Sequence, residues 1–131
     1  MSQITIYFVY AMQIAVAVGL LNVWILRFNR NTIYRGSNAH NMKEEFAVYN
    51  LPVWFMYAVG FLKVVIALVM IAALVLPNLM YPAGFYSLVL LSGLMIGAIS
   101  MHIKIKDSLI KMIPAIAMFA MTILTLSFGF L

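Results

Sequence analysis

The sequence predicts an all-α membrane protein, a bundle of four transmembrane helices with a short amphipathic interfacial helix between the first two. Composition is the first observation: of 131 residues, 66% are hydrophobic and 8% are charged, against about 25% charged in soluble domains. The second observation is four continuous apolar segments, residues 4–26, 51–76, 83–102 and 109–131. Each is close to the ~20 residues that a spanning helix needs, and none alternates with the period of a β-barrel strand. We expect a single transmembrane domain over residues 1–131.

The first segment, residues 4–26, has no basic residues before it and no small-residue cleavage site. We therefore expect a retained span and not a signal peptide. The chain also has no cysteine. This excludes thiolate nucleophiles, iron–sulfur ligation and covalent haem attachment.

The connection after the first span is long and polar, and its second half predicts the interfacial helix. Asn41 followed by Glu44 resembles a capping box, in which the asparagine side chain caps the helix. Met42, Phe46 and Tyr49 then follow at helical spacing, which predicts an amphipathic turn on the membrane surface. This helix either connects two spans or offers a docking surface for a partner.

The second segment, residues 51–76, carries a lysine, Lys63, near its middle. An ionisable residue at the bilayer midplane costs at least ~2.5–3.5 kcal/mol on insertion scales. Gly60 and Ala67 lie one turn away on the same helix face, and such small residues indicate that this face points into the bundle. No span contains a carboxylate, so we expect amide, hydroxyl or backbone oxygens to bind the ammonium, with Gln13 and Thr122 as the intramembrane candidates beside Gly60.

Small residues also mark the remaining spans. Ala11, Ala15 and Gly19 repeat every four residues in the first span, and Gly93 with Gly97 has GxxxG spacing in the third. We expect these residues to let neighbouring helices pack closely within the bundle.

Charge placement predicts the topology. Seven of the eight basic residues flank or lie in the first and third connections, and the second connection, residues 77–82, has no charge. Lys and Arg are enriched in cytoplasmic loops. We therefore expect a multi-pass protein of the bacterial cytoplasmic (inner) membrane with both termini outside the cytoplasm, and no binding to nucleic acid.

Both histidines, His40 and His102, then belong to the cytoplasmic face, together with Arg35. These three are the candidates for a site at that face. They lack the cysteine or carboxylate company of a metal or haem site, so we predict neither a metal nor a catalytic residue.

Several short motifs together resemble the DoxX-like family of small four-helix membrane proteins. They run in the family's order from Arg35 to Ala115, and comprise RG at 35–36, NMKEEF at 41–46, LP at 51–52, GFLK at 60–63, MIGA at 95–98 with His102, and PA at 114–115. Where this chain has Lys63, many relatives carry glutamate and others lysine, so no role of an acidic residue carries over. The resemblance implies an accessory protein of quinone-linked or redox-defence membrane assemblies, or in distant animal relatives a receptor-assembly chaperone.

Three hypotheses about function follow. The first is a non-catalytic subunit or assembly partner of a membrane complex. It would have no cofactor of its own and would bind a protein partner or a second copy of itself. The second is a bundle that binds a quinone or lipid with Lys63. The third is a small proton or anion pathway through Lys63. The surroundings of the Lys63 ammonium distinguish them.

Overall fold

The computed structural model describes residues 2–130, and these residues form helices and no strand. The elements are α1 (Gln3–Leu21), the π-helical turn η1 (Asn22–Leu26), α2 (Met42–Val48), α3 (Val53–Val75), the 3-10 turn η2 (Pro77–Met80), α4 (Ala83–Lys104) and α5 (Leu109–Gly129). Four helices, the first being α1 continued through η1, are long and apolar enough to cross a membrane. The predicted all-α, four-span class is confirmed. The last residue of the predicted fourth span, Leu131, lies outside the described residues.

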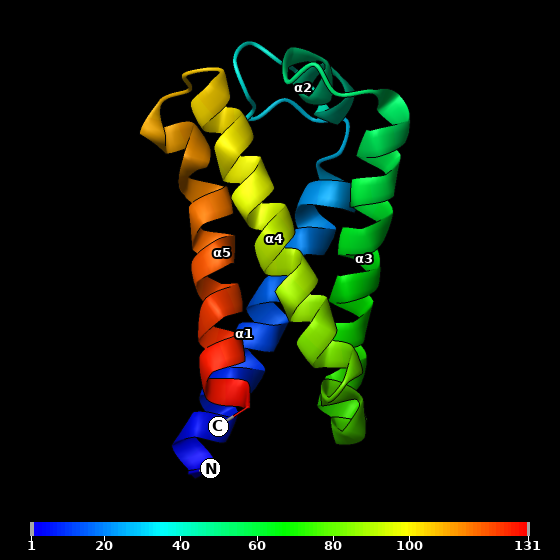
Figure 1. Cartoon of the computed structure of the whole chain (residues 1–131), viewed down its shortest axis with the longest axis vertical. Coiled ribbons are helices and arrows are strands. Elements are labelled where there is room, and N and C mark those ends of the chain that lie inside the picture. Colours follow the sequence, from blue (N-terminus) through cyan, green and yellow to red (C-terminus); the bar gives the residue numbers. More distant parts are fainter. Residues whose placement is uncertain (1, 131) are drawn as a thin grey trace.

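The four long helices form a ring in which each contacts two neighbours. α1 packs against α3 and α5, and α4 packs against α3 and α5. Figure 1 shows both termini at one end of the bundle and α2 at the other. Successive long helices therefore run in opposite directions, and the two basic connections, residues 27–41 and 105–108, share the α2 end.

The core is packed most completely away from α2. Ten buried residues from the four long helices form one cluster there: Val16, Ala17, Leu20, Ile66, Ala67, Met70, Leu88, Leu91, Met95 and Met118. A smaller cluster of Trp24, Met42, Met56 and Val59 lies beneath α2. The buried polar groups of the packed part are satisfied by backbone. The Gln13 amide donates to the Met70 carbonyl at 3.3 Å, and the Thr122 hydroxyl donates to the Met118 carbonyl at 2.8 Å.

The predicted short helix is present as α2, and its start has the expected cap. The Asn41 side-chain oxygen accepts from the backbone N–H of Glu44 at 2.8 Å. The Glu44 carboxylate accepts from the backbone N–H of His40 at 2.9 Å, one residue earlier than in a reciprocal capping box. The buried face of α2 carries Met42 and Glu45, followed by Tyr49. An acidic residue thus points inward where the sequence suggested only an apolar stripe.

Candidate ligand cavity and its polar network

A cavity of about 640 Å³ occupies the part of the bundle between its middle and α2. Most of its lining is apolar and comes from α1, η1, α2, α3, α4 and α5. Representative apolar residues are Leu20, Trp24, Val59, Leu94, Met101 and Met118. The polar lining includes Arg35, Glu45, Tyr49, Lys63 and His102. The cavity therefore has a long apolar wall and a polar region concentrated near α2.

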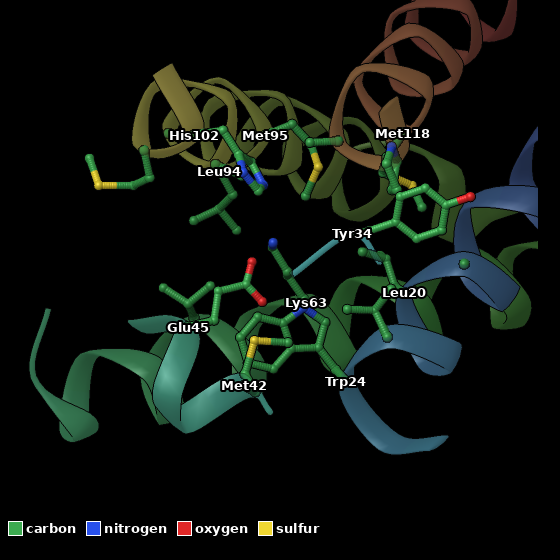
Figure 2. A pocket seen from close by; sticks show the side chains of 18 of the residues that line it. Leu20, Trp24, Tyr34, Met42, Glu45, Lys63, Leu94, Met95, His102 and Met118 are labelled. Atoms are coloured by element: carbon green, nitrogen blue, oxygen red, sulfur yellow. The ribbon is translucent and has the colours of Figure 1, made fainter. Parts of the chain in front are cut away.

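Lys63 lies at the middle of α3, and its side chain is 7% exposed. Figure 2 shows the ammonium pointing into the cavity, toward the space between Glu45 and His102. Its nitrogen is 5.3 Å from the centre of the Trp24 ring. Among residues 2–130, no hydrogen bond and no ion pair within 4.0 Å involves this ammonium. A cation over an aromatic face gains about 0.5–2 kcal/mol, so Lys63 retains unused donor capacity.

The position of Trp24 depends on η1 and on Gly60. The π-helical turn Asn22–Leu26 places the indole against α3, and π turns inside α-helices are frequent at functional sites. A Cβ added at Gly60 would lie 2.6 Å from Cε3 of Trp24. The absence of a side chain at Gly60 therefore leaves room for the Trp24 ring, over which Lys63 extends. The predicted close approach at Gly60 is made by a side chain and not by a neighbouring backbone.

Arg35 joins the long connection to α2. Its Nη1 lies 2.9 Å from Oε2 of Glu45 in a buried ion pair. The same guanidinium donates to the carbonyls of Arg27, Phe28 and Arg30. An arginine with this many buried partners fixes the connection 27–41 and also holds the Glu45 carboxylate at the cavity wall.

Tyr49 connects Glu45 to α4. Its hydroxyl donates to Oε1 of Glu45 at 2.7 Å and lies 3.4 Å from Nε2 of His102. Burial, reinforced by the nearby Glu45 carboxylate, raises the pKa of the Tyr49 phenol well above its ordinary value of 10.0. The phenol therefore stays protonated at physiological pH.

His102 connects this group to the third connection. Its Nδ1 lies 2.7 Å from Oδ2 of Asp107, and Oδ1 of Asp107 accepts from the backbone N–H of Ser37 at 2.9 Å. Lys111 donates to the Ser37 carbonyl. A continuous buried chain of polar groups thus runs from Arg35 through Glu45, Tyr49 and His102 to Asp107. We call these five residues the polar chain.

The predicted candidates are only partly brought together. Lys63, Arg35 and His102 line the cavity, whereas Gln13, Gly60 and Thr122 do not. Gln13 is bound to the Met70 carbonyl, two helical turns along α3 from Lys63. His40 is exposed and does not line the cavity. The ammonium therefore does not meet the amide and hydroxyl expected from the sequence.

Sequence reasoning missed Glu45, Tyr49, Trp24 and Asp107 as members of this site. The sequence pattern places Tyr49 on the apolar stripe of a surface helix and gives Glu45 no role. Their spacing of four residues was the available signal, because it places both on one helix face with Met42. Asp107 lies three residues beyond Lys104, the last residue of α4, and five residues after His102, and nothing in its local sequence indicated this pairing.

The two glycines of α4 also differ from expectation. A Cβ added at Gly93 or Gly97 would meet no atom within 4 Å, and both residues line the cavity. They face open space and not a neighbouring helix. Gly19 does have a close neighbour, because a Cβ there would lie 2.5 Å from Cε of Met118.

The chemistry available here is binding and proton exchange. Within the described chain, no three His, Asp or Glu side chains gather as a metal site would require. His102 is already engaged by Asp107 and Tyr49. What remains free to meet a ligand is the Lys63 ammonium, the apolar wall, and the groups of the polar chain that face the cavity.

Comparison with known proteins gives one match. The model of a family described as the DoxX-like family matches residues 32–125, which is more than half of the chain. The matched region includes α2, α3, α4 and most of α5, and thus every member of the polar chain as well as Lys63. No curated protein and no solved structure matches.

Proposed function

The chain belongs to the DoxX-like family, and we propose that this integral membrane protein binds an amphiphilic, quinone- or lipid-like molecule in its cavity. One observation carries the proposal. A nine-tenths buried lysine points into an apolar cavity of about 640 Å³ without a hydrogen-bonding partner among the described residues. An oxygen acceptor on a ligand would meet the ammonium there.

The shape of the cavity favours an amphiphile. Its volume lies within the range of about 300–1,000 Å³ typical of small-molecule sites. Apolar residues of α1, α4 and α5 would contact a hydrocarbon chain, while Lys63 and the polar chain would surround a headgroup. A molecule with both parts would also reach the protein from within the bilayer.

Energetics favour a ligand acceptor at Lys63 over a purely structural lysine. The contact with Trp24 offsets only part of the cost of placing an ammonium at mid-membrane depth. A structural lysine would be expected to use its remaining donors on backbone or side-chain oxygens. A charge-assisted hydrogen bond to a ligand oxygen would contribute about 1.5–3 kcal/mol.

We further propose the setting in which this binding operates. The basic first and third connections share one end of the bundle, which supports a cytoplasmic location for that end and an external location for both termini. The family resemblance, and the absence of cysteine from the sequence, support a non-catalytic subunit or assembly partner of a bacterial inner-membrane complex. A quinone-linked redox complex is the form that the resemblance favours.

Native mass spectrometry of the chain, expressed at its natural level and gently extracted, tests both ligand binding in the cavity and membership of a membrane complex. The parent protein should carry one molecule of lipid-like or quinone-like mass. Gly97→Leu places a side chain in the cavity and should lose this mass, whereas Gly97→Ala should keep it. Lys63→Met should reduce occupancy, and Lys104→Met, at an exposed position, should not.

An empty parent protein, or a Gly97→Leu variant that retains the same mass, would contradict ligand binding in the cavity. The same spectra bear on the subunit role. If every mild extraction yields only the isolated chain, with no other protein bound, a stable complex would be contradicted.

A further inference from the structure

The charges around the cavity are unequal. Four basic side chains line it, namely Arg27, Arg35, Lys63 and Lys111, whereas Glu45 is the only lining carboxylate in residues 2–130. Arg35 is committed to Glu45 and Lys111 to the Ser37 carbonyl. The side chains of Arg27 and Lys63 have no such partner among residues 2–130, and of these two Arg27 is exposed and Lys63 is buried. A surplus of positive charge in a mostly apolar space favours an anionic headgroup over a neutral one.

Glu45 opposes the binding of such an anion. Figure 2 shows its carboxylate and the Lys63 ammonium both directed into the same space. The two groups form no ion pair within 4.0 Å, so a headgroup beside Lys63 would lie close to Glu45. Repulsion between two anions is strong where water is scarce. A proton on Glu45 would remove it and would leave the charge of Arg35, now paired with Glu45, to attract the bound anion instead.

The polar chain can supply that proton without moving a heavy atom. With a proton on His102, both ring N–H groups donate, Nδ1 to Asp107 and Nε2 to the Tyr49 oxygen, and Tyr49 donates to ionised Glu45. With the proton on Glu45, the carboxyl donates to the Tyr49 oxygen and Tyr49 donates to Nε2 of His102. The His102 N–H bond and the Tyr49 O–H bond break as new Tyr49 O–H and Glu45 O–H bonds form.

Tyr49 is suited to relay this proton. It stays protonated, because burial and Glu45 raise the pKa of its phenol, so it exchanges one proton for another and never stores a charge. Its hydroxyl lies between the two groups that do change charge, at 2.7 Å and 3.4 Å. The far end of the chain, Asp107, lies in a connection whose neighbours Lys106 and Ser108 are exposed. Water on that side can load the chain before the transfer: a neutral His102 that carries its proton on Nε2 takes a second proton on Nδ1 through Asp107, which gives the doubly protonated imidazole described above.

We propose that the cavity takes a single-chain amphiphile with an anionic headgroup, bound by Lys63, and that binding draws a proton to Glu45 through Tyr49 and His102. This inference rests on the proposed function, because it specifies the ligand of the same cavity. The ionisable groups that line the cavity with Glu45 are Arg27, Tyr34 and Arg35 from the first connection, Tyr49 from the end of α2, Lys63 from α3, His102 from α4 and Lys111 from α5. Asp107, from the third connection, lies behind His102.

Trp24 offers a direct readout. The chain has two tryptophans, Trp24 beside Lys63 and the exposed Trp54. Trp54→Phe leaves Trp24 as the sole tryptophan, and its fluorescence should report occupancy of the cavity. The full-length protein would be placed in phosphatidylcholine nanodiscs and titrated with dodecanesulfonate, whose headgroup stays ionised throughout. Dodecanol, of equal chain length and without charge, is the matched probe.

Dodecanesulfonate should bind at least about tenfold more tightly than dodecanol. Its affinity should be higher at lower pH, by up to about tenfold per pH unit, because the bound state holds more protons than the free state. A pH indicator in weak buffer should register uptake of up to one proton per anion. Glu45→Gln should bind tightly with little pH dependence, whereas Glu44→Gln, an exposed neighbour, should behave like the parent.

Tyr49→Phe tests whether the proton reaches Glu45 through the Tyr49 hydroxyl. The variant keeps the ring but removes the relaying hydroxyl, so stopped-flow proton uptake should lag well behind binding. Uptake as fast as in the parent would overturn the role of Tyr49. In the parent alone, sulfonate binding without proton uptake, or equal affinity for the two probes, would overturn the inference while leaving amphiphile binding intact. If neither probe changes Trp24 fluorescence and neither shows binding in equilibrium dialysis, the proposed function itself fails.

Discussion

At the residue scale, Lys63 and Glu45 show how a charge is held at depth in this bundle. Glu45 has a full set of partners, with Arg35 at 2.9 Å and the Tyr49 hydroxyl at 2.7 Å. Lys63 has an aromatic face at 5.3 Å and an open space in front of it. A buried carboxylate with two strong partners has its charge compensated, so removing either partner would be costly. A buried ammonium with one weak partner costs stability and is better explained by what it binds.

Replacing Lys63 should therefore leave the fold intact. Lys63→Met nearly keeps the length of the side chain and removes the ammonium. The unfolding free energy of the ligand-free, detergent-extracted protein should therefore stay the same or rise by up to about 2 kcal/mol, and its thermal midpoint should be equal or higher. Differential scanning fluorimetry would measure it, with Lys104→Met as the control. A clear loss of stability in Lys63→Met alone would mean that the ammonium stabilises the fold.

The Tyr49 phenol makes stability depend on pH in the alkaline range. Its pKa is raised in the folded protein, so the phenol ionises in the unfolded chain above its ordinary pKa of 10.0 but remains neutral when folded. The contribution of the Tyr49 phenol to the free energy of unfolding is complete below about pH 10. It is lost as the pH rises further, by at most about 1.4 kcal/mol per pH unit. Thermal midpoints between about pH 8 and 11 should fall less steeply in Tyr49→Phe. Tyr86→Phe, at an exposed position, should keep the parent's slope.

At the element scale, two glycines on facing helices have opposite roles. Gly60 on α3 gives space to Trp24, whereas Gly97 on α4 faces the cavity. The hydropathy of the spans allowed the helices to be predicted within a few residues, because apolar length and flanking polar residues determine where each helix can cross. It did not allow the roles of these glycines to be predicted. GxxxG spacing indicates that one helix face carries only small side chains. Whether a neighbouring helix fills the space beside that face depends on the tilt of that helix.

The pair Gly60→Ala and Gly97→Ala tests this difference with the same added methyl group. At Gly60 it would lie 2.6 Å from the Trp24 ring, so the indole must move, at a cost of about 1–3 kcal/mol. At Gly97 no atom lies within 4 Å, so the gain in helix propensity should dominate, up to about 1 kcal/mol. Unfolding midpoints would measure both. Equal destabilisation of the two variants would contradict the open space at Gly97.

At the scale of the whole molecule, the bundle is packed at one end and hollow toward the other. The membrane class follows from composition, because a chain with 8% charged residues requires lipid around most of its surface, and the four helices follow from the four apolar segments. The cavity and the polar chain could not be predicted, because they depend on α2 folding over the end of the bundle. The absence of a carboxylate from every span was correctly seen, yet Glu45 reaches the cavity from outside the spans.

The membrane orientation is testable without background labelling, since the chain has no cysteine. A cysteine at Asn78, in the turn at the end that carries the termini, should react with an impermeant maleimide in intact cells. A cysteine at the exposed Asn38, near α2, should react only after the membrane is permeabilised. The reverse pattern would place the basic connections outside the cell.

The ring of helices closes between α1 and α5, which are the first and last spans and contact one another directly. Both termini emerge at the same end (Figure 1). A short linker between them would therefore turn the chain into a cycle, which could be reopened at Pro77–Met80 without separating any pair of packed helices. Such a circular permutant would begin with α4 and end with α3. If this permutant folds and keeps the cavity, the order in which the spans are synthesised is separable from the arrangement that forms the cavity.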